Sequence, residues 1–307
     1  MTNRRQFIHS VAGLTALTAL TTSTSKGKGF KFPISCNAYN WTTFYKRQKK
    51  TWGENLDACI AEFAKTGIKA YEPSLNNAKE AHDLIAVLKK YNIAMPSIYV
   101  NSVMHKADEV EKSIQNVLAI ADEAKIYGTK IVVTNPSPIK WGSEELKSDE
   151  QLQTQAAAME RLGTTLKQKG MILAYHTHAP EFLAGAREFH HVMLNTSPQY
   201  VSFCFDVHWV FRGSSNSKVA VFDVLKLYAK RIVELHVRQS VDGIWSETFG
   251  EGDIDYPRLV RELKAMKIYP HIVIEQCIED KTPNTMTGLE AHIKDIAIFE
   301  KTFAPLL

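Results

Sequence analysis

Ionisable side chains follow five apolar, strand-like runs of this 307-residue chain, and they are its clearest reactive groups. By number they are Glu72, His176, His178, Glu181, Asp206, His208, His236, Arg238 and Glu275. Unpaired buried charges are costly, whereas one divalent cation can partner several carboxylates and imidazoles at once. The set therefore predicts a metal site. Its carboxylate content favours Mn²⁺, Mg²⁺ or Co²⁺ over a closed structural zinc.

These residues share one rim if the apolar runs are parallel strands of a barrel. Runs rich in Val, Ile and aromatic residues predict eight strands: Ile34–Asn37, Ile68–Glu72, Ile93–Tyr99, Lys130–Thr134, Ile172–His176, Val201–Asp206, Ile232–Val237 and His271–Glu275. Amphipathic patterns predict helices over 55–66, 78–91, 107–127, 144–169, 219–229, 256–266 and 284–303. Eight βα units predict a single-domain (β/α)₈ TIM barrel, whose active face is built at the carboxyl ends of its strands. A doubly wound open sheet is the alternative, although no GxGxxG motif follows the first strand.

Four motifs, in order and with barrel spacing, resemble the xylose-isomerase-like TIM-barrel superfamily. YHTHAPEF resembles the YHNHDFEF stretch of many sugar isomerase/epimerase-like members, and FDVHW resembles their strand-6 aspartate motif. ELHVRQ with GEGDIDY resembles their LHVKD…GEGDID stretch, and IVIEQ resembles their closing glutamate strand. The resemblance covers about residues 30–305. The superfamily includes sugar epimerases, inosose dehydratases and hydroxypyruvate isomerases.

The resemblance implies one divalent metal ion, with Mn²⁺ expected first and Mg²⁺, Co²⁺ or Zn²⁺ as alternatives. The implied ligands are Glu181, Asp206, His236 and Glu275. In some members the strand-5 glutamate occupies the place held here by His176, so the first ligand is alternatively His176 or His178. Where the family has Lys-Asp after the strand-7 histidine, this chain has Arg238 and Gln239.

The family chemistry begins with a sugar carbonyl and its neighbouring hydroxyl on the cation, followed by loss of a proton from the α-carbon. His176 and His178 are the candidate bases, because the reaction needs a base that titrates near neutral pH. Either one is alternatively an outer residue that orients a ligand. Expected substrate contacts are Glu72, His208, Arg238 and Trp209. A structural ion pair for Glu72 and simple packing for Trp209 are the alternatives.

The N-terminus resembles a twin-arginine export signal. Arg4 and Arg5 precede a weakly apolar stretch, Val11 to Leu20, that contains no acidic residue. That stretch is too short to span a bilayer, which needs about 20 residues. We therefore expect a signal over residues 1–25, a barrel domain over residues 26–307 and a periplasmic location. A cysteine is missing after the apolar stretch, so no stable membrane anchor is expected.

Composition and charge narrow the function further. A net charge of +4 with no extended basic run argues against nucleic acid as a partner, and against a nuclease of similar fold. Four scattered cysteines without metal-binding spacing predict buried free thiols, with a disulfide as the alternative. The expected function is a metal-dependent isomerase or epimerase acting on an unphosphorylated sugar or keto-sugar. The alternatives are a lyase or dehydratase on a 3-keto glycoside or inosose, and a non-catalytic sugar- or metal-binding barrel.

Overall fold

The computed structural model describes residues 32–307, and the predicted export signal lies outside these residues. Eight parallel strands form one sheet in the order β2-β1-β10-β7-β6-β5-β4-β3. They are β1 (Ser35–Asn37), β2 (Ala70–Glu72), β3 (Ser97–Asn101), β4 (Ile131–Asn135), β5 (Ile172–Tyr175), β6 (Val201–Asp206), β7 (Ile232–Val237) and β10 (His271–Ile274). Backbone bonds such as Leu75 N to Tyr99 O (2.9 Å) bring β2 beside β3, so the sheet curls into a nearly closed barrel. The predicted TIM barrel is confirmed.

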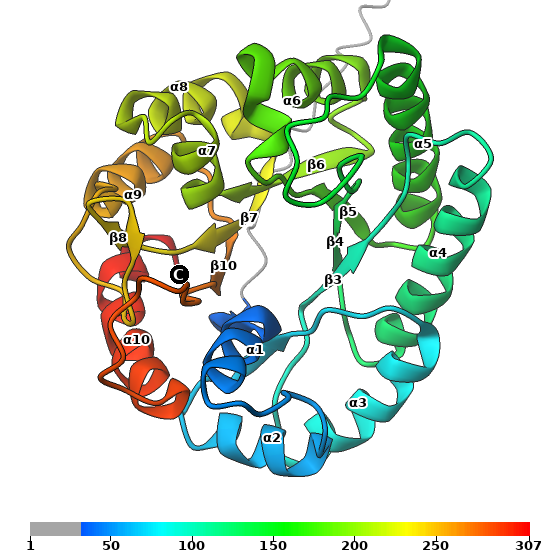
Figure 1. Ribbon diagram of the computed structural model, residues 1–307. Coiled ribbons are helices and arrows are strands. Elements are labelled where there is room, and N and C mark those ends of the chain that lie inside the picture. The colour runs from blue at the N-terminus through cyan, green and yellow to red at the C-terminus, as the bar shows by residue number, and fades with distance from the viewer. Residues whose placement is uncertain (1–31) are drawn as a thin grey trace, which may run out of the picture.

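Helices surround the barrel on its outside, as Figure 1 shows. They are α1 (Ala38–Arg47), α2 (Leu56–Ala64), α3 (Ala78–Lys90), α4 (Val110–Ile126), α5 (Asp149–Gln168), α6 (Leu183–Asn195), α7 (Val207–Gly213), α8 (Lys218–Tyr228), α9 (Tyr256–Ala265) and α10 (Gly288–Phe303). Several begin at a side chain that caps the first free backbone amides. Ser148 and Thr287, for example, form capping boxes at the starts of α5 and α10.

The strands were predicted more completely than the elements of the active face. All eight expected strands are present, whereas α1, α6 and α7 were not predicted. Helices α1 and α7 follow their strands without any loop, because Asn37 and Asp206 end a strand and cap the next helix. A small hairpin, β8 (Ser240–Val241) and β9 (Ile244–Trp245), also lies in the segment between β7 and α9.

The barrel interior changes from apolar to ionisable toward the carboxyl ends of the strands. Alternate residues of a strand face the same side. Ala174 and Cys204 therefore point inward, and both belong to a small buried cluster inside the barrel. His176 and Asp206 lie two residues further along the same strands. The barrel thus places His176 and Asp206 directly above Ala174 and Cys204.

Two further expectations concern the membrane and the thiols. Within residues 32–307, no helix combines the length and the apolar character needed to cross a membrane. The four cysteines are buried free thiols, as predicted.

Candidate active site

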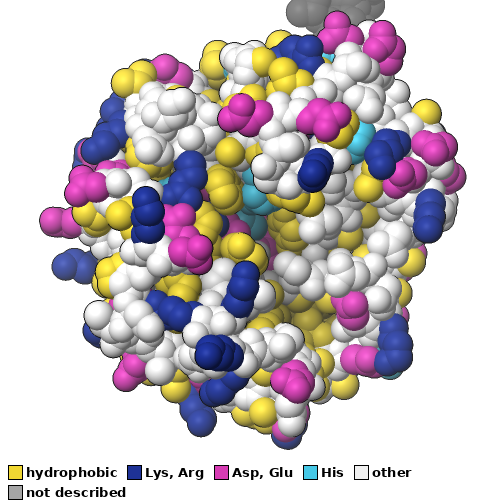
Figure 2. All heavy atoms as spheres, in the orientation of Figure 1, with side chains coloured by type: hydrophobic (Ala, Val, Ile, Leu, Met, Phe, Trp, Pro, Cys, Tyr) yellow, Lys and Arg dark blue, Asp and Glu magenta, His cyan; other side chains and the backbone are white. Residues whose placement is uncertain are grey.

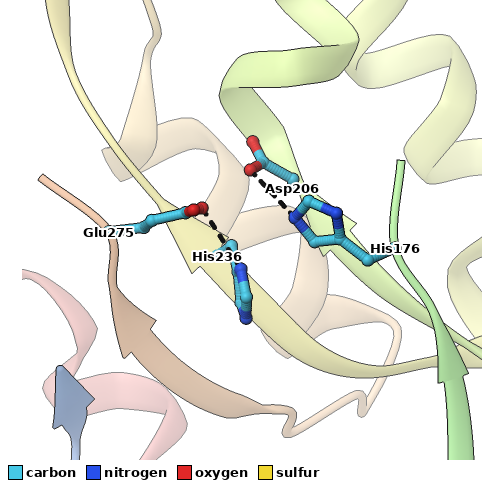
Figure 3. A group of neighbouring side chains, drawn as sticks. All are labelled: His176, Asp206, His236 and Glu275. Carbon is cyan, nitrogen blue, oxygen red and sulfur yellow. Dashed lines mark hydrogen bonds and ion pairs between the residues drawn. The ribbon is translucent and has the colours of Figure 1, made fainter. Parts of the chain in front are cut away.

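Four side chains from four neighbouring strands meet at the carboxyl rim of the barrel (Figure 3). His176 follows β5, Asp206 ends β6, His236 lies in β7 and Glu275 follows β10. One nitrogen or oxygen of each lies within 4.8 Å of the others. They meet because the strands are in register: Asp206 pairs with His236, and Val273, two residues before Glu275, also pairs with His236. We call these four residues the rim group.

The rim group has the donors of a divalent-cation site. His176, Asp206 and His236 are completely buried, and Glu275 is 6% exposed. His176 Nε2 and Asp206 Oδ2 lie 3.3 Å apart, yet neither has a hydrogen-bond partner among the described residues. Buried polar atoms are nearly always paired, so these two orphaned atoms require a partner. Two imidazole nitrogens and two carboxylates fit Mn²⁺, Co²⁺ or Zn²⁺, and the residues present therefore suit the expected metal.

A buried cation, Arg238, lies beside the rim group. Its Nη2 is 3.2 Å from Glu275 Oε2, and its Nε donates to the Glu275 carbonyl at 2.9 Å. The guanidinium also lies against the rings of Trp245 (4.1 Å to the centroid) and Trp209 (5.3 Å). Burial alone would raise the pKa of Glu275, but Arg238 and His236 hold it below its usual value. Glu275 is therefore an anion at neutral pH.

A second buried polar layer lies beneath His236. Its Nε2 is 3.1 Å from Glu72 Oε2 and 3.2 Å from Glu234 Oε1, while Nδ1 faces Glu275 at 3.2 Å. Asn37 Nδ2 donates to Glu72 Oε2 at 2.6 Å. Glu72, Glu234 and Asn37 are all buried. Glu72 thus contacts the imidazole from below, at the position of an orienting residue, and not the cavity where a substrate would bind.

Glu181, the first ligand that the family resemblance implied, lies outside the rim group. Its Oε1 accepts from Asn135 Nδ2 at 2.7 Å, and its Oε2 accepts from the backbone amide of His178 at 2.8 Å. Burial and the nearby Glu188 carboxylate raise its pKa to about 7. The reason is local geometry: Glu181 lies in a 3₁₀ turn, Pro180–Phe182, five residues past the inward-facing His176. The residue after strand β5 that belongs to the rim group is His176, which is the alternative that the sequence left open.

A cavity of about 560 Å³ opens above the rim group and reaches Glu275. Figure 2 shows the hollow in this face, with hydrophobic and histidine side chains toward its base. Its lining includes Tyr39, Tyr99, Trp141, His178 and Trp209, and contains no lysine or arginine. His178 Nδ1 is buried without a hydrogen-bond partner. Burial and neighbouring His176 hold the pKa of His178 well below its usual value, which keeps the ring neutral at pH 7.

His208 does not reach the cavity lining. The expected substrate contact of His208 is not seen, because strand β6 ends at Asp206 and α7 begins at Val207, which turns the side chain away from the cavity. Its Nε2 instead lies 3.0 Å from Ser240 Oγ, and its ring packs edge-on against Trp245.

The sequence did not single out Tyr39 and Tyr99, which line the cavity, or Glu234, which lies in the polar layer under His236. Glu234 had a signal, since it precedes His236 by two residues and so shares its face of the strand. Tyr39 had none, because it belongs to the unpredicted helix α1.

Known proteins share the architecture of this chain. The family description "Xylose isomerase-like TIM barrel" matches residues 60–297. An inosose dehydratase of Mesomycoplasma hyopneumoniae is 25% identical over 248 residues, covering 74% of this chain and 82% of the relative. One of Clostridium perfringens is 23% identical over 270 residues, covering 78% and 87%.

Solved structures share the fold at low sequence identity. A sugar phosphate isomerase/epimerase of Parabacteroides distasonis has a TM-score of 0.67 at 17% identity, covering 95% of this chain and 99% of that one. A xylose isomerase-like barrel protein of Mycobacterium smegmatis, in complex with magnesium, has a TM-score of 0.66 at 13% identity, covering 90% and 98%. Because the family match extends over most of the barrel, this chain belongs to the xylose isomerase-like TIM barrel family.

Proposed function

We propose that the protein is a divalent-metal-dependent isomerase or epimerase that acts on an unphosphorylated keto-sugar through an enediolate. One observation carries the proposal: His176 Nε2 and Asp206 Oδ2 are buried, orphaned and adjacent, next to His236 and Glu275. A divalent cation held by these residues would polarise a sugar carbonyl as a Lewis acid. Mn²⁺ is the ion we expect, because it accepts both carboxylate and imidazole ligands.

The charges around the rim group suit a reaction that builds up negative charge. Asp206 and Glu275 contribute two negative charges, and Arg238 contributes one positive charge. A divalent cation held there, together with Arg238, would more than offset the charges of Asp206 and Glu275. Preorganised positive charge in a buried site stabilises an oxyanion developing on the substrate. Arg238, fixed by Glu275 and two tryptophans, supplies part of that charge without needing to move.

His178 is the proposed proton acceptor. It lines the cavity next to the rim group, and its neutral ring can take a proton from the carbon beside the carbonyl. Return of the proton to another face or another carbon gives the epimer or isomer. The cavity lining lacks lysine and arginine, so nothing in it pairs with a phosphate. This supports a neutral substrate.

A lyase or dehydratase is the second candidate function. A specific observation favours it: among the residues that the structure describes, His178 is the one imidazole in the cavity lining, whereas a two-base epimerase needs acceptors on both faces of the substrate. Elimination needs a single base and a departing β-hydroxyl or alkoxide. The curated relatives named above are inosose dehydratases.

Deuterium exchange separates these functions. Metal-loaded protein is incubated in D₂O with free keto-sugars, inososes and 3-keto glycosides, and the products are followed by NMR. We expect deuterium at an α-carbon, lost with EDTA and with Asp206→Asn. A product of unchanged composition identifies an isomerase or epimerase, and an unsaturated product identifies a lyase. Metal binding without exchange on any compound would mean a sugar- or metal-binding barrel.

We also propose that the protein is exported to the periplasm. Arg4 and Arg5 before a short apolar stretch support this proposal. Fractionation of cells that carry the full chain, compared with an Arg4→Lys, Arg5→Lys variant, tests it. Retention of both proteins in the cytoplasm would contradict it.

A further inference from the structure

A second, larger groove adjoins the cavity above the rim group. It has a volume of about 1510 Å³ and is walled by α1, α7, the β8–β9 hairpin and the loop after β10. Figure 1 shows these elements on one side of the barrel mouth. Two residues line both spaces, Tyr39 from α1 and Trp209 from α7. The two spaces therefore adjoin at this pair of aromatic residues.

The far wall of the groove is held rigidly. Arg212 forms two bonds to Glu279, at 2.9 and 3.0 Å, and a third to the Gly243 carbonyl at 2.7 Å. The backbone amide of Trp245 donates to the same Glu279 carboxylate at 2.9 Å. Arg212 lies 4.6 Å from the centroid of the Trp245 ring. The groove is thus shaped before any ligand arrives, as most ligand sites are.

The charges of the groove balance. Arg47 is paired with Glu247 at 2.7 Å, and Arg212 is paired with Glu279. The other charged side chains of the lining are two lysines and two aspartates: Lys46, Lys281, Asp242 and Asp280. With Thr42, Thr43, Asn216 and Asn284 they make a surface rich in hydrogen-bond donors and acceptors but with no net charge. Such a surface suits a hydroxyl-rich neutral ligand better than a phosphate.

We propose that this groove binds the second unit of a neutral glycoside or disaccharide, whose other unit lies in the cavity at Glu275. The linkage passes between Tyr39 and Trp209, whose apolar rings offer faces for the two sugars. The identity of the reacting unit depends on the proposed function, because that function places the reaction at the rim group. The binding of a second unit in the groove does not depend on it. The natural substrate is accordingly a two-unit compound, and a free monosaccharide fills only part of the site.

Saturation-transfer NMR on the full chain tests this assignment. The probes are cellobiose, maltose, trehalose and sucrose, with glucose, methyl β-D-glucoside and glucose 6-phosphate for comparison. We expect at least one disaccharide to receive saturation on both rings, and to bind about tenfold more tightly than glucose. Glucose 6-phosphate should bind no more tightly than glucose. Saturation of a single ring in every disaccharide, or no gain over glucose, overturns the proposal.

A pair of variants at one exposed position of α1 locates the second unit. Thr42→Trp places a bulky ring in the groove, while Thr42→Ala removes only a hydroxyl that bonds the Ala38 carbonyl. In Thr42→Trp the disaccharide should bind no more tightly than glucose, while the affinity for glucose is unchanged. In Thr42→Ala the disaccharide should still bind about tenfold more tightly than glucose, and the affinity for glucose should again be unchanged. Equal behaviour of the two variants overturns the assignment.

Failure of the proposed function would look different. Mn²⁺-loaded protein broadens the NMR signals of nearby protons, so one sugar ring should broaden strongly and the other weakly. Two-ring saturation without such broadening keeps the groove and removes the metal site at Glu275. Broadening of a monosaccharide with no disaccharide advantage keeps the metal site and removes the groove.

Discussion

The Nε2 atom of His236 lies 3.1 Å from Glu72 Oε2, on the side of the ring opposite to Glu275. The imidazole is thus held between carboxylates at both of its nitrogens. Only Nδ1 faces the rim group, so Nδ1 is the atom available to a metal. A metal on Nδ1 would leave the ring hydrogen on Nε2, where the lower carboxylates can accept it. Metal-binding histidines are commonly oriented in this way by an outer carboxylate.

Replacing Glu72 or Glu234 by glutamine should weaken Mn²⁺ binding about 10- to 100-fold, the usual effect of losing such a partner. The reason is that a neutral amide is a weaker acceptor than a carboxylate for the hydrogen on Nε2, and it can also turn its NH₂ group toward the ring. Calorimetric titration measures the affinity, and ¹⁵N NMR of His236 reports the tautomer. Glu62→Gln, on helix α2, is the control. Unchanged affinity with an unchanged tautomer in both variants would refute the role.

Arg238→Met should strengthen metal binding and weaken catalysis. Arg238 lies 3.2 Å from Glu275 Oε2 and competes with a cation for this carboxylate. Removing the guanidinium lowers that competition but also removes positive charge from the site. Arg238→Lys keeps the charge but loses the guanidinium contacts with the rings of Trp209 and Trp245. Its metal affinity and exchange rate should therefore lie between those of the parent and of Arg238→Met. Mn²⁺ titration and the deuterium-exchange rate, measured together, should move in opposite directions; a parallel loss of both would contradict this account.

The two carboxylate oxygens of Asp206 have different contacts, so different substitutions can separate its effect on folding from its effect on metal binding. Its Oδ1 accepts from the Trp209 amide at 2.8 Å and caps α7, while Oδ2 faces His176. Asp206→Asn keeps the capping oxygen and loses the negative charge. We expect it to unfold at nearly the parent temperature, with Mn²⁺ affinity reduced by more than about 100-fold, beyond the loss of an outer partner. Asp206→Ala should lose the metal and, in addition, about 1 kcal/mol of stability. Thermal unfolding of the apo proteins distinguishes them, and equal melting temperatures would count against the capping role.

Glu181 should make the stability of the protein fall between mildly acidic and neutral pH. Its pKa rises from 4.5 to about 7 on folding, mainly because of burial. Between these values the folded state holds a proton that the unfolded state has released, so stability decreases as the pH rises. Glu181→Gln removes this decrease. The melting temperature of the variant relative to the parent should therefore increase from pH 5 to pH 8, and parallel profiles would disprove the assignment.

The sequence predicts the barrel well because its strands are short, apolar and regularly spaced. The same alternation places Asp206, His236 and Glu275 on the inner face, since each ends or continues a clear strand. The rim-group residue that follows strand β5 is harder to predict from the sequence. His176, His178 and Glu181 lie within six residues, and only the course of the backbone after Tyr175 decides which one faces inward. That course depends on the tertiary bond between Glu181 and Asn135, 46 residues away along the chain.

The remaining features depend on contacts that periodicity does not encode. Helix α1 has no preceding loop to announce it, and it brings Tyr39 to the mouth of the barrel. Arg238 follows a strand, as expected, but its burial between two tryptophans results from the folding of the β8–β9 hairpin. The polar layer under His236 joins residues from β1, β2 and β7, which meet only in the closed barrel.

The β8–β9 hairpin pairs only with itself and shares no ladder with the eight barrel strands. Its Asp242-Gly243 turn, with both residues at positive φ, closes it locally. Mutations that change the length or sequence of this turn but keep Trp245 against Arg238 would leave the barrel ladder and the rim group intact. Substrate range can therefore diversify in evolution at this wall of the groove while the catalytic chemistry is inherited unchanged.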